Sequence, residues 1–139
     1  MVPGSLRGFG IPARAAAMSD PFYVTTAINY PNGPPHIGHA YEAIATDVVA
    51  RFQRMRGRDV FFQTGTDEHG LKMAQTARER GLEPAAFSEE MSRYFRQMAE
   101  MLDISFDRFI RTTEPAHHRA SQTIWQAMAA KGDLSLGRY

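Results

Sequence analysis

The chain has 139 residues, which is the length of about one domain at roughly 100–200 residues per domain. Its 43% hydrophobic and 22% charged residues exclude a chain that is disordered throughout, and its lack of cysteine excludes disulfides, thiolate metal sites and a cysteine nucleophile. A formal net charge of +1 gives no sign of a nucleic-acid binder, and no apolar run approaches the roughly 18 residues of a membrane span. A soluble, intracellular chain with no membrane partner is what these features leave.

Residues 1–20 differ in composition from the rest of the chain. They contain Arg7 and Arg14, small residues and Gly/Pro breaks, and no acidic residue comes before Asp20. Such a basic, acid-poor leader is typical of organellar transit peptides, but two arginines are few. A disordered extension, or an untranslated stretch ahead of a start at Met18, explains it more simply. We expect a cytoplasmic protein with its domain in residues 21–139, and organellar targeting is the alternative.

The domain is predicted to begin with a strand over Phe22–Ile28, a β-branched and aromatic run of strand length. Residues 29–35 then form a tight loop, because their prolines fix φ and their Asn-Gly pair tolerates positive φ. A helix follows and ends at Gly57. Its apolar residues recur at steps of three and four and form one stripe: Ile37, Tyr41, Ile44, Val48, Phe52 and Met55.

A second strand, Val60–Thr64, completes a strand–helix–strand unit of about forty residues, which predicts parallel strands and a right-handed crossover. The remaining predicted elements are a helix over Leu71–Arg80, a helix from about Pro84, a strand over Phe106–Arg111 and a helix from Pro115 to a break at Gly132. In the helix from about Pro84, the residues predicted to face inward are Phe87, Met91, Tyr94, Met98 and Leu102. In the helix from Pro115, they are Ala120, Ile124 and Met128. The strand–helix–strand unit supplies two parallel strands and one crossover, which are too few to complete a doubly wound sheet, so we expect a fragment of one.

The segment from Pro31 to Tyr41 carries the first chemical pattern. It follows a strand at its carboxyl end and runs into a helix N-terminus, where free N–H groups and the helix dipole favour anions. His36 and His39 are three residues apart and share one helix face, from which two imidazoles can donate hydrogen bonds to a polyphosphate. Gly38 between them leaves the backbone open to a flat group such as a purine. The same spacing is also typical of surface or capping histidines, and zinc would need a third ligand that is not near in sequence.

The pattern is similar to the first signature of the class I aminoacyl-tRNA synthetases, in the run Thr25–Gly33 leading into His36-Ile37-Gly38-His39. A second run, Gln63-Thr64-Gly65-Thr66-Asp67-Glu68-His69-Gly70, follows the second strand. Together with Tyr30, it resembles the methionyl-tRNA synthetases more closely than the isoleucine, leucine or valine enzymes. The resemblance covers Phe22 to Tyr139, which is all of the chain except the leader.

The resemblance implies the first half of a Rossmann-like nucleotide-binding fold that enters the family's connective insertion near the end of the chain. It also implies a two-step reaction. Methionine is activated with ATP to methionyl-adenylate, and the methionyl group is then transferred to tRNA(Met) in protein biosynthesis. The implied partners are ATP with its Mg²⁺, L-methionine and tRNA(Met). Any zinc-binding cysteines of the insertion would lie beyond Tyr139.

The resemblance further implies which residues bind the substrates. His36 and His39 are the catalytic pair that acts on the phosphates. The implied ATP-binding set is Pro31, Asn32, Gly33, His36, Gly38 and His39. The implied methionine-binding set is Ala27, Ile28, Tyr30 and Asp67. An aromatic slot suits the polarizable thioether, and a carboxylate at a strand end pairs with an ammonium group in a charge-assisted bond of about 1.5–3 kcal/mol.

Several residues near these sets have more than one interpretation. Tyr30 is also suited to pack on the core as a loop aromatic, and Asp67 is suited to cap the helix that follows it. Glu42 either complements the helix dipole or faces the ligand, and His69 is interpreted as a turn residue that supports its loop.

Two clusters are interpreted without a substrate. A basic cluster at the end of the first helix forms either a solvated face or a contact for nucleic-acid phosphates: Arg51, Arg54, Arg56 and Arg58. Three methionines are interpreted as core filling: Met91, Met98 and Met101.

The sequence departs from the family pattern in its second signature, a Lys-Met-Ser-Lys-Ser loop, which is absent. Lys72-Met73-Ala74-Gln75 shares two letters with it but directly follows the second strand. We therefore expect half a site, and no activity from the chain alone. Two other functions stay open: another class I aminoacyl-tRNA synthetase, or a non-catalytic module that binds a nucleotide or a tRNA end.

Overall fold

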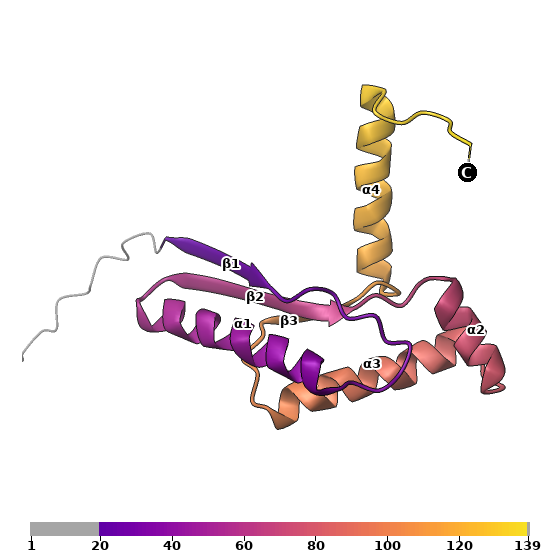
Figure 1. Cartoon of the computed structure of the whole chain (residues 1–139). Helices are drawn as coiled ribbons and strands as arrows, with labels where there is room; N and C mark the ends of the chain where they lie inside the picture. The colour runs from indigo at the N-terminus through magenta and orange to yellow at the C-terminus, as the bar shows by residue number, and fades with distance from the viewer. Residues whose placement is uncertain (1–19, 139) are drawn as a thin grey trace, which may run out of the picture.

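The structure is a computed structural model that describes residues 20–138, so the expectation for the leader falls on residues outside this range. Three parallel strands form one sheet in the order β1-β2-β3 (Figure 1). The elements are β1 (Pro21–Thr25), α1 (Ile37–Met55), β2 (Asp59–Thr66), α2 (Leu71–Glu79), α3 (Pro84–Met101), β3 (Arg108–Arg111) and α4 (Pro115–Lys131). The α/β class with parallel strands is confirmed.

Helix ends follow local signals in the sequence. Gly57, with φ of +81°, follows the end of α1, and Gly132, with φ of +77°, caps α4 in the left-handed conformation. Pro84 and Pro115 occupy the first turns of α3 and α4, where a missing N–H leaves no hydrogen bond unmade. The predicted helix bounds therefore agree with the structure to within a residue or two.

The end of β1 differs from the prediction, because the strand stops at Thr25 rather than at Ile28. Thr25 pairs with Gln63, and pairing resumes at an isolated bridge between Asn29 and Thr66. Four steps of chain on one side thus match three on the other, which is a bulge with one extra residue. Within the bulge the N–H of Ala27 donates to the Glu42 carboxylate at 2.6 Å instead of to the sheet.

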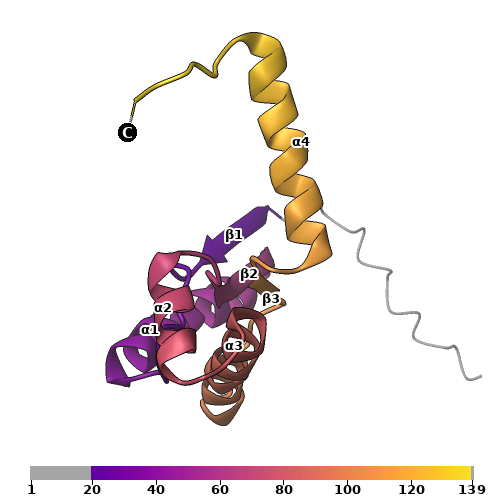
Figure 2. The same ribbon diagram turned by 90° about the vertical axis from the view of Figure 1, so that its right-hand side faces the viewer.

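Both α1 and α3 cover the same face of the sheet in the two ribbon views (Figures 1 and 2). The first core cluster fills the space between them and the strands: Ala43, Ala50, Phe62, Ala99 and Ile104. The second cluster lies between α2 and α3, with Tyr30 packed against it: Met73, Ala77, Phe87 and Met91. Asp47 is buried beside the first cluster, where it accepts a hydrogen bond from the Ser105 N–H at 2.9 Å.

The apolar stripe of α1 does not face this core. Ile37, Tyr41 and Met55 are 85%, 75% and 86% exposed, and the three stripe residues between them are exposed as well. The buried face of α1 is instead Ala43, Asp47 and Ala50. Small side chains let the helix approach the sheet closely, so periodicity identifies an amphipathic helix without showing which face packs first.

The later helices also differ from their predicted inward faces. In α3, Phe87 and Met91 are buried as predicted, but Phe95 and Ala99 are buried where Tyr94 and Leu102 were predicted. Met101, predicted as core filling, is 87% exposed.

No residue of α4 is buried, so the predicted inward set of Ala120, Ile124 and Met128 is wrong, and Figure 2 shows this helix standing away from the sheet. None of the helices within residues 20–138 is long and apolar enough to cross a membrane.

Candidate functional site

The carboxyl ends of the three strands bring distant loops together at one edge of the sheet. Asn29 donates its N–H to the Gly65 carbonyl at 3.0 Å, and the Asp67 N–H donates to the Asn29 carbonyl at 2.7 Å. Thr112, after β3, donates its N–H to the Thr66 carbonyl at 3.2 Å. The predicted methionine-binding residues before and after Asn29 therefore lie beside Asp67, although about forty residues separate them in sequence. Asn29 and Thr112 were not predicted as part of this arrangement.

His36 and His39 hold each other at the start of α1. His36 is the N-cap, its Nδ1 accepts from the Gly38 N–H at 3.1 Å, and its own N–H donates to Nδ1 of His39 at 3.1 Å. The two rings stack with centroids 3.8 Å apart, and the His39 ring also contacts the buried Phe95 edge-on at 4.9 Å. Because both Nδ1 atoms accept, the neutral rings carry their protons on Nε2, which remain available as donors.

The surroundings of His39 favour its neutral form. Burial lowers the pKa of His39 below its ordinary value, and the neighbouring His36 lowers it further, while Glu42 opposes both. His39 is therefore suited to donate a hydrogen bond from an uncharged ring. Capping and catalysis were separate interpretations of the sequence, and the geometry makes them compatible.

Gly38 leaves room for the His36 ring at this turn, which the sequence did not indicate. A Cβ at Gly38 would lie 3.0 Å from Cε1 and 3.1 Å from Nδ1 of His36, so a side chain would require the capping ring to shift by a few tenths of an ångström. The open backbone expected for a purine and the room needed by His36 thus have the same origin. The role of Gly38 toward adenine remains a prediction.

Glu42 connects the two predicted binding sets. It lies one turn after His39 on α1, and its Oε1 accepts the Ala27 N–H. Sequence left Glu42 open between a dipole partner and a ligand contact. The structure gives one of its oxygens a third role, which is to hold the bulge that carries Ala27 and Ile28 against the second turn of α1.

The remaining predicted residues differ in exposure. Tyr30 packs on the α2–α3 cluster, and its hydroxyl lies 2.4 Å from where a Cβ at Gly70 would stand. Pro31 is fully buried, whereas Asn32 and Gly33 are partly exposed. Tyr30 therefore packs on the core, as one interpretation expected, and it does so from a position beside the Asp67 loop.

Two hollows lie near the site. One of about 230 Å³ lies against the sheet at the bulge and is lined by Thr25, Thr26, Ile28, Gln63, Thr64, Gly65 and Ile110. A larger apolar groove of about 430 Å³ lies between the loop at Pro34 and the end of α3, and none of the predicted site residues lines it. The smaller hollow is the one lined by a residue of the predicted methionine-binding set, Ile28.

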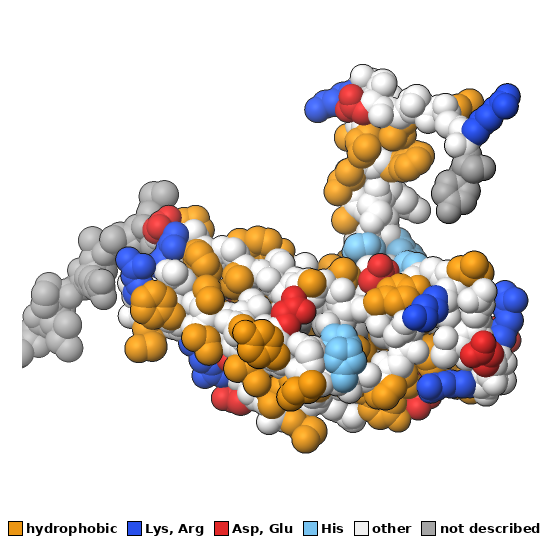
Figure 3. Space-filling model, viewed as in Figure 1, with side chains coloured by type: hydrophobic (Ala, Val, Ile, Leu, Met, Phe, Trp, Pro, Cys, Tyr) orange, Lys and Arg blue, Asp and Glu red, His pale blue; other side chains and the backbone are white. Residues whose placement is uncertain are grey.

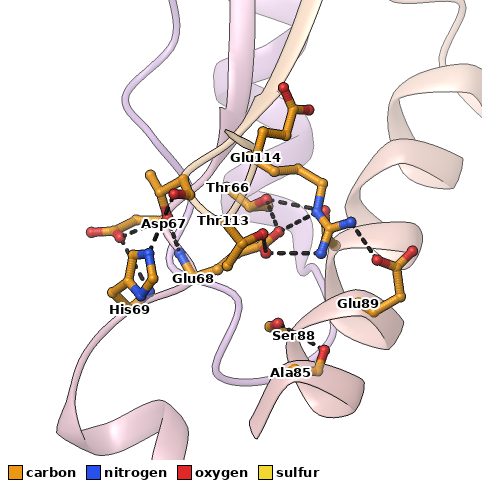
Figure 4. A network of polar contacts seen from close by, with 12 residues as sticks. Thr66, Asp67, Glu68, His69, Ala85, Ser88, Glu89, Thr113 and Glu114 are labelled. Atoms are coloured by element: carbon orange, nitrogen blue, oxygen red, sulfur yellow. Dashed lines mark hydrogen bonds and ion pairs between the residues drawn. The ribbon is translucent and has the colours of Figure 1, made fainter. Parts of the chain in front are cut away.

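Glu68 is the main feature that sequence reasoning missed. Its side chain is fully buried, and its two oxygens accept from Arg111 Nε at 2.7 Å, Arg111 Nη2 at 2.9 Å, Thr66 Oγ1 at 2.8 Å and Thr113 Oγ1 at 2.6 Å (Figure 4). Arg111 also pairs with Glu89. A usable signal exists in the sequence, because an acidic residue at the end of a buried strand needs a cation, and Arg111 ends the next strand.

These contacts keep Glu68 ionised. Burial by itself raises the pKa of Glu68, but the hydrogen bonds from Arg111, Thr113 and Thr66 outweigh it, and the pKa lies below its ordinary value. The hydrogen bond to Glu68 in turn raises the pKa of Arg111. Glu68 is therefore a buried, fully paired anion.

Asp67 and His69, on either side of Glu68, have looser contacts. The Asp67 carboxylate accepts from the His69 N–H and the Thr112 hydroxyl, both at 3.4 Å and both on Oδ1. Nε2 of His69 lies 3.3 Å from the Thr112 carbonyl, so His69 supports its loop as predicted. The second oxygen of Asp67, Oδ2, is thereby available to a cation.

The basic cluster at the end of α1 is largely paired. Arg51 contacts Asp47 at 2.7 Å, Arg54 contacts Asp107 at 2.8 Å, and Arg58 contacts Asp20 at 2.6 Å. These pairs favour the solvated face over a phosphate contact. Within residues 20–138 no three His, Asp or Glu side chains converge as metal ligands.

Comparison with known proteins decides among the families. Residues 22–139 match the family described as tRNA synthetases class I (M). The chain belongs to this family. The resemblance found in the two motifs is confirmed, and so is the Rossmann-like N-terminal region that it implied.

Relatives within the family are methionine enzymes. The methionine–tRNA ligases of Brucella suis and Rhizobium meliloti are 59% and 60% identical over 118 and 121 residues, which cover 85% and 87% of this chain and 23% of each relative. The Mycobacterium tuberculosis methionyl-tRNA synthetase, solved in complex with methionyl-adenylate, superposes with a TM-score of 0.80 at 58% identity, covering 81% of this chain and 22% of that one.

A more distant match is a LeuRS–tRNA ternary complex from Agrobacterium radiobacter, with a TM-score of 0.73, 28% identity, 85% of this chain and 16% of that chain. The class I (M) members are thus about twice as similar in sequence as this leucine enzyme. The chain spans less than a quarter of the length of the curated relatives that it matches.

Proposed function

We propose that this chain supplies the N-terminal, ATP- and methionine-binding part of a methionine–tRNA ligase. The observation that carries the proposal is the capped and stacked pair His36–His39, held through Glu42 and the Ala27 bulge beside the loop of Asp67. Identities of 58–60% to methionine enzymes support the choice of amino acid over other class I specificities.

In the proposed reaction, the methionine carboxylate attacks the α-phosphate of ATP in line and releases pyrophosphate. The Nε2–H groups of His36 and His39 donate to phosphate oxygens as their charge changes, and Asp67 pairs with the ammonium group. Positioning and charge stabilisation dominate such phosphoryl chemistry, because little proton transfer is needed. A ribose hydroxyl at the 3′ end of tRNA(Met) then takes the methionyl group.

The described residues do not build a protein site for Mg²⁺. Both oxygens of Glu68 already accept hydrogen bonds and are not free to bind a metal ion. No three potential ligands converge in residues 20–138. We therefore propose that Mg²⁺ would act only as the counter-ion of ATP and that no described residue of this chain binds it. A cytoplasmic location belongs to the same proposal.

We also propose that the chain alone does not turn over, because the second signature is missing from it and its relatives are about four times as long. The test is a chimaera in which residues 22–139 replace the matching segment of the Brucella suis ligase. We expect ATP–pyrophosphate exchange that depends on methionine and is weak with leucine or isoleucine. Exchange by the isolated chain would contradict the half-site, and a folded chimaera without methionine-dependent exchange would contradict the proposed function.

A further inference from the structure

Two adjacent carboxylates at the end of β2 have opposite surroundings. The Glu68 side chain is 0% exposed and receives four hydrogen bonds, whereas Asp67 is partly exposed and receives two long ones. Neighbouring anions compete for a cation. Glu68 does not compete with Asp67 for the cation of a ligand, because both oxygens of Glu68 already accept two hydrogen bonds each. Asp67 keeps Oδ2 for such a cation.

Arg111 supplies the difference between the two carboxylates. Its guanidinium approaches Glu68 side-on through Nε and Nη2, and its third nitrogen, Nη1, pairs with Glu89 on α3. This planar fork has a fixed geometry that a lysine cannot reproduce. With two carboxylates around it, Arg111 joins the ends of β2 and β3 to α3.

Thr112 connects the Glu68–Arg111 ion pair to Asp67. Its hydroxyl accepts the Glu68 N–H at 2.8 Å and donates toward Oδ1 of Asp67 at 3.4 Å. Its carbonyl faces His69, and its N–H is fixed to the Thr66 carbonyl. Figure 4 shows Asp67 and His69 on one side of Glu68 and Glu89 on the other. A shift of Arg111 therefore moves the residue that orients Asp67.

We propose that the buried Glu68–Arg111 ion pair is a positioning device that, through Thr112, aims the free oxygen of Asp67 at the ammonium group of the amino acid. This inference rests on the proposed function, and it adds residues that do not touch the substrate. Its consequence is selective: recognition of the amino group depends on the pair, whereas binding of ATP depends on the histidine turn of α1.

The test uses Arg111→Lys and Glu68→Gln in the chimaera, with Arg108→Lys as the matched control. Arg108 lies on the same strand and pairs with Glu114, but its side chain is 45% exposed. In pyrophosphate exchange, we expect the Arg111 and Glu68 variants to raise KM for methionine about tenfold and to change KM for ATP less than about twofold. The control is expected to change neither value by more than about twofold.

Two further measurements separate positioning from a general loss of structure. The inhibition constant of a methionine analogue without the amino group should be unchanged by Arg111→Lys. In an Asp67→Asn background, Arg111→Lys should cause no additional rise in KM for methionine, because its effect passes through Asp67. Thr112→Val, which keeps the ion pair and removes the hydroxyl, should raise KM for methionine in the same direction and serves where Arg111→Lys does not fold.

The outcomes distinguish the two proposals. A parent chimaera without methionine-dependent exchange contradicts the proposed function and this inference with it. If the parent is active, two results overturn the positioning role alone. Arg111→Lys or Thr112→Val either weakens the binding of ATP, methionine and the amine-free analogue alike, or leaves the binding of all three unchanged.

Discussion

The strand ends and the outer helix surfaces of this molecule are built differently. At the carboxyl edge of the sheet, buried polar groups have partners, as Glu68 and Thr66 show. On the outer faces of α1 and α4, apolar side chains are exposed (Figure 3). Phe52 and Trp125 are among them. Polar loops at the edge are therefore organised by residues within this chain, whereas no residue between 20 and 138 covers the apolar surfaces of these two helices.

The largest expected effect concerns the hydrophobic core, where a buried position can be compared with an exposed one on the same strand. Phe62→Ala should lower the free energy of unfolding by about 3–5 kcal/mol, because a fully buried ring leaves a cavity. Its neighbour on β2, Phe61, is 46% exposed, so Phe61→Ala should cost much less. Urea unfolding of the isolated chain followed by circular dichroism compares the two. Equal costs would show that the outer side of the sheet is already covered.

The next effect concerns the histidine pair. His36→Ala or His39→Ala in the chimaera should lower the rate of pyrophosphate exchange about 10²–10³-fold, the cost of losing one donor to a developing anion. His117→Ala, on α4, is the control and should keep the rate within about twofold. A small effect on exchange together with a lower melting temperature would reduce the pair to a helix cap.

Local signals predicted most of the fold, and the reason lies in how short their range is. Gly57, Pro84, Pro115 and Gly132 mark helix ends through their own backbone preferences. The bulge at Ala27 was not predictable in this way, because it depends on a carboxylate fifteen residues away on another element.

The same distinction between local signals and contacts of distant residues applies to the candidate site. Asp67 and the two histidines belong to contiguous motifs, so sequence found them. The Glu68–Arg111 pair joins residues 43 positions apart, and it becomes visible only when β2 and β3 lie side by side. The outward face of α1 escaped for another reason: the periodicity of its apolar residues is real, but none of the described residues packs on that face and buries it.

A smaller effect is expected from pH. The folded chain lowers the pKa of Glu68 below its ordinary value of 4.5 and that of Asp47 below 3.8, so both carboxylates add stability that is complete above those values. That stability is lost as the pH falls through the lower, folded-state pKa values. Urea unfolding between pH 7 and pH 3 should show a steeper decline for the parent than for Glu68→Gln. Parallel curves would place the stabilising contacts elsewhere.

The smallest expected effect sharpens the comparison most, because it uses one substitution in two settings. Val48 is 61% exposed on the apolar face of α1, so Val48→Lys in the isolated chain should change the free energy of unfolding by no more than about 0.5 kcal/mol. In the chimaera the additional polypeptide is expected to cover this face, and the same lysine would then bury a charge without a partner and lower the melting temperature clearly. Arg56→Lys at the end of α1 is the control for both settings. If Val48→Lys is equally mild in both, the outer face of α1 stays open in the longer protein, and its apolar residues need a different explanation.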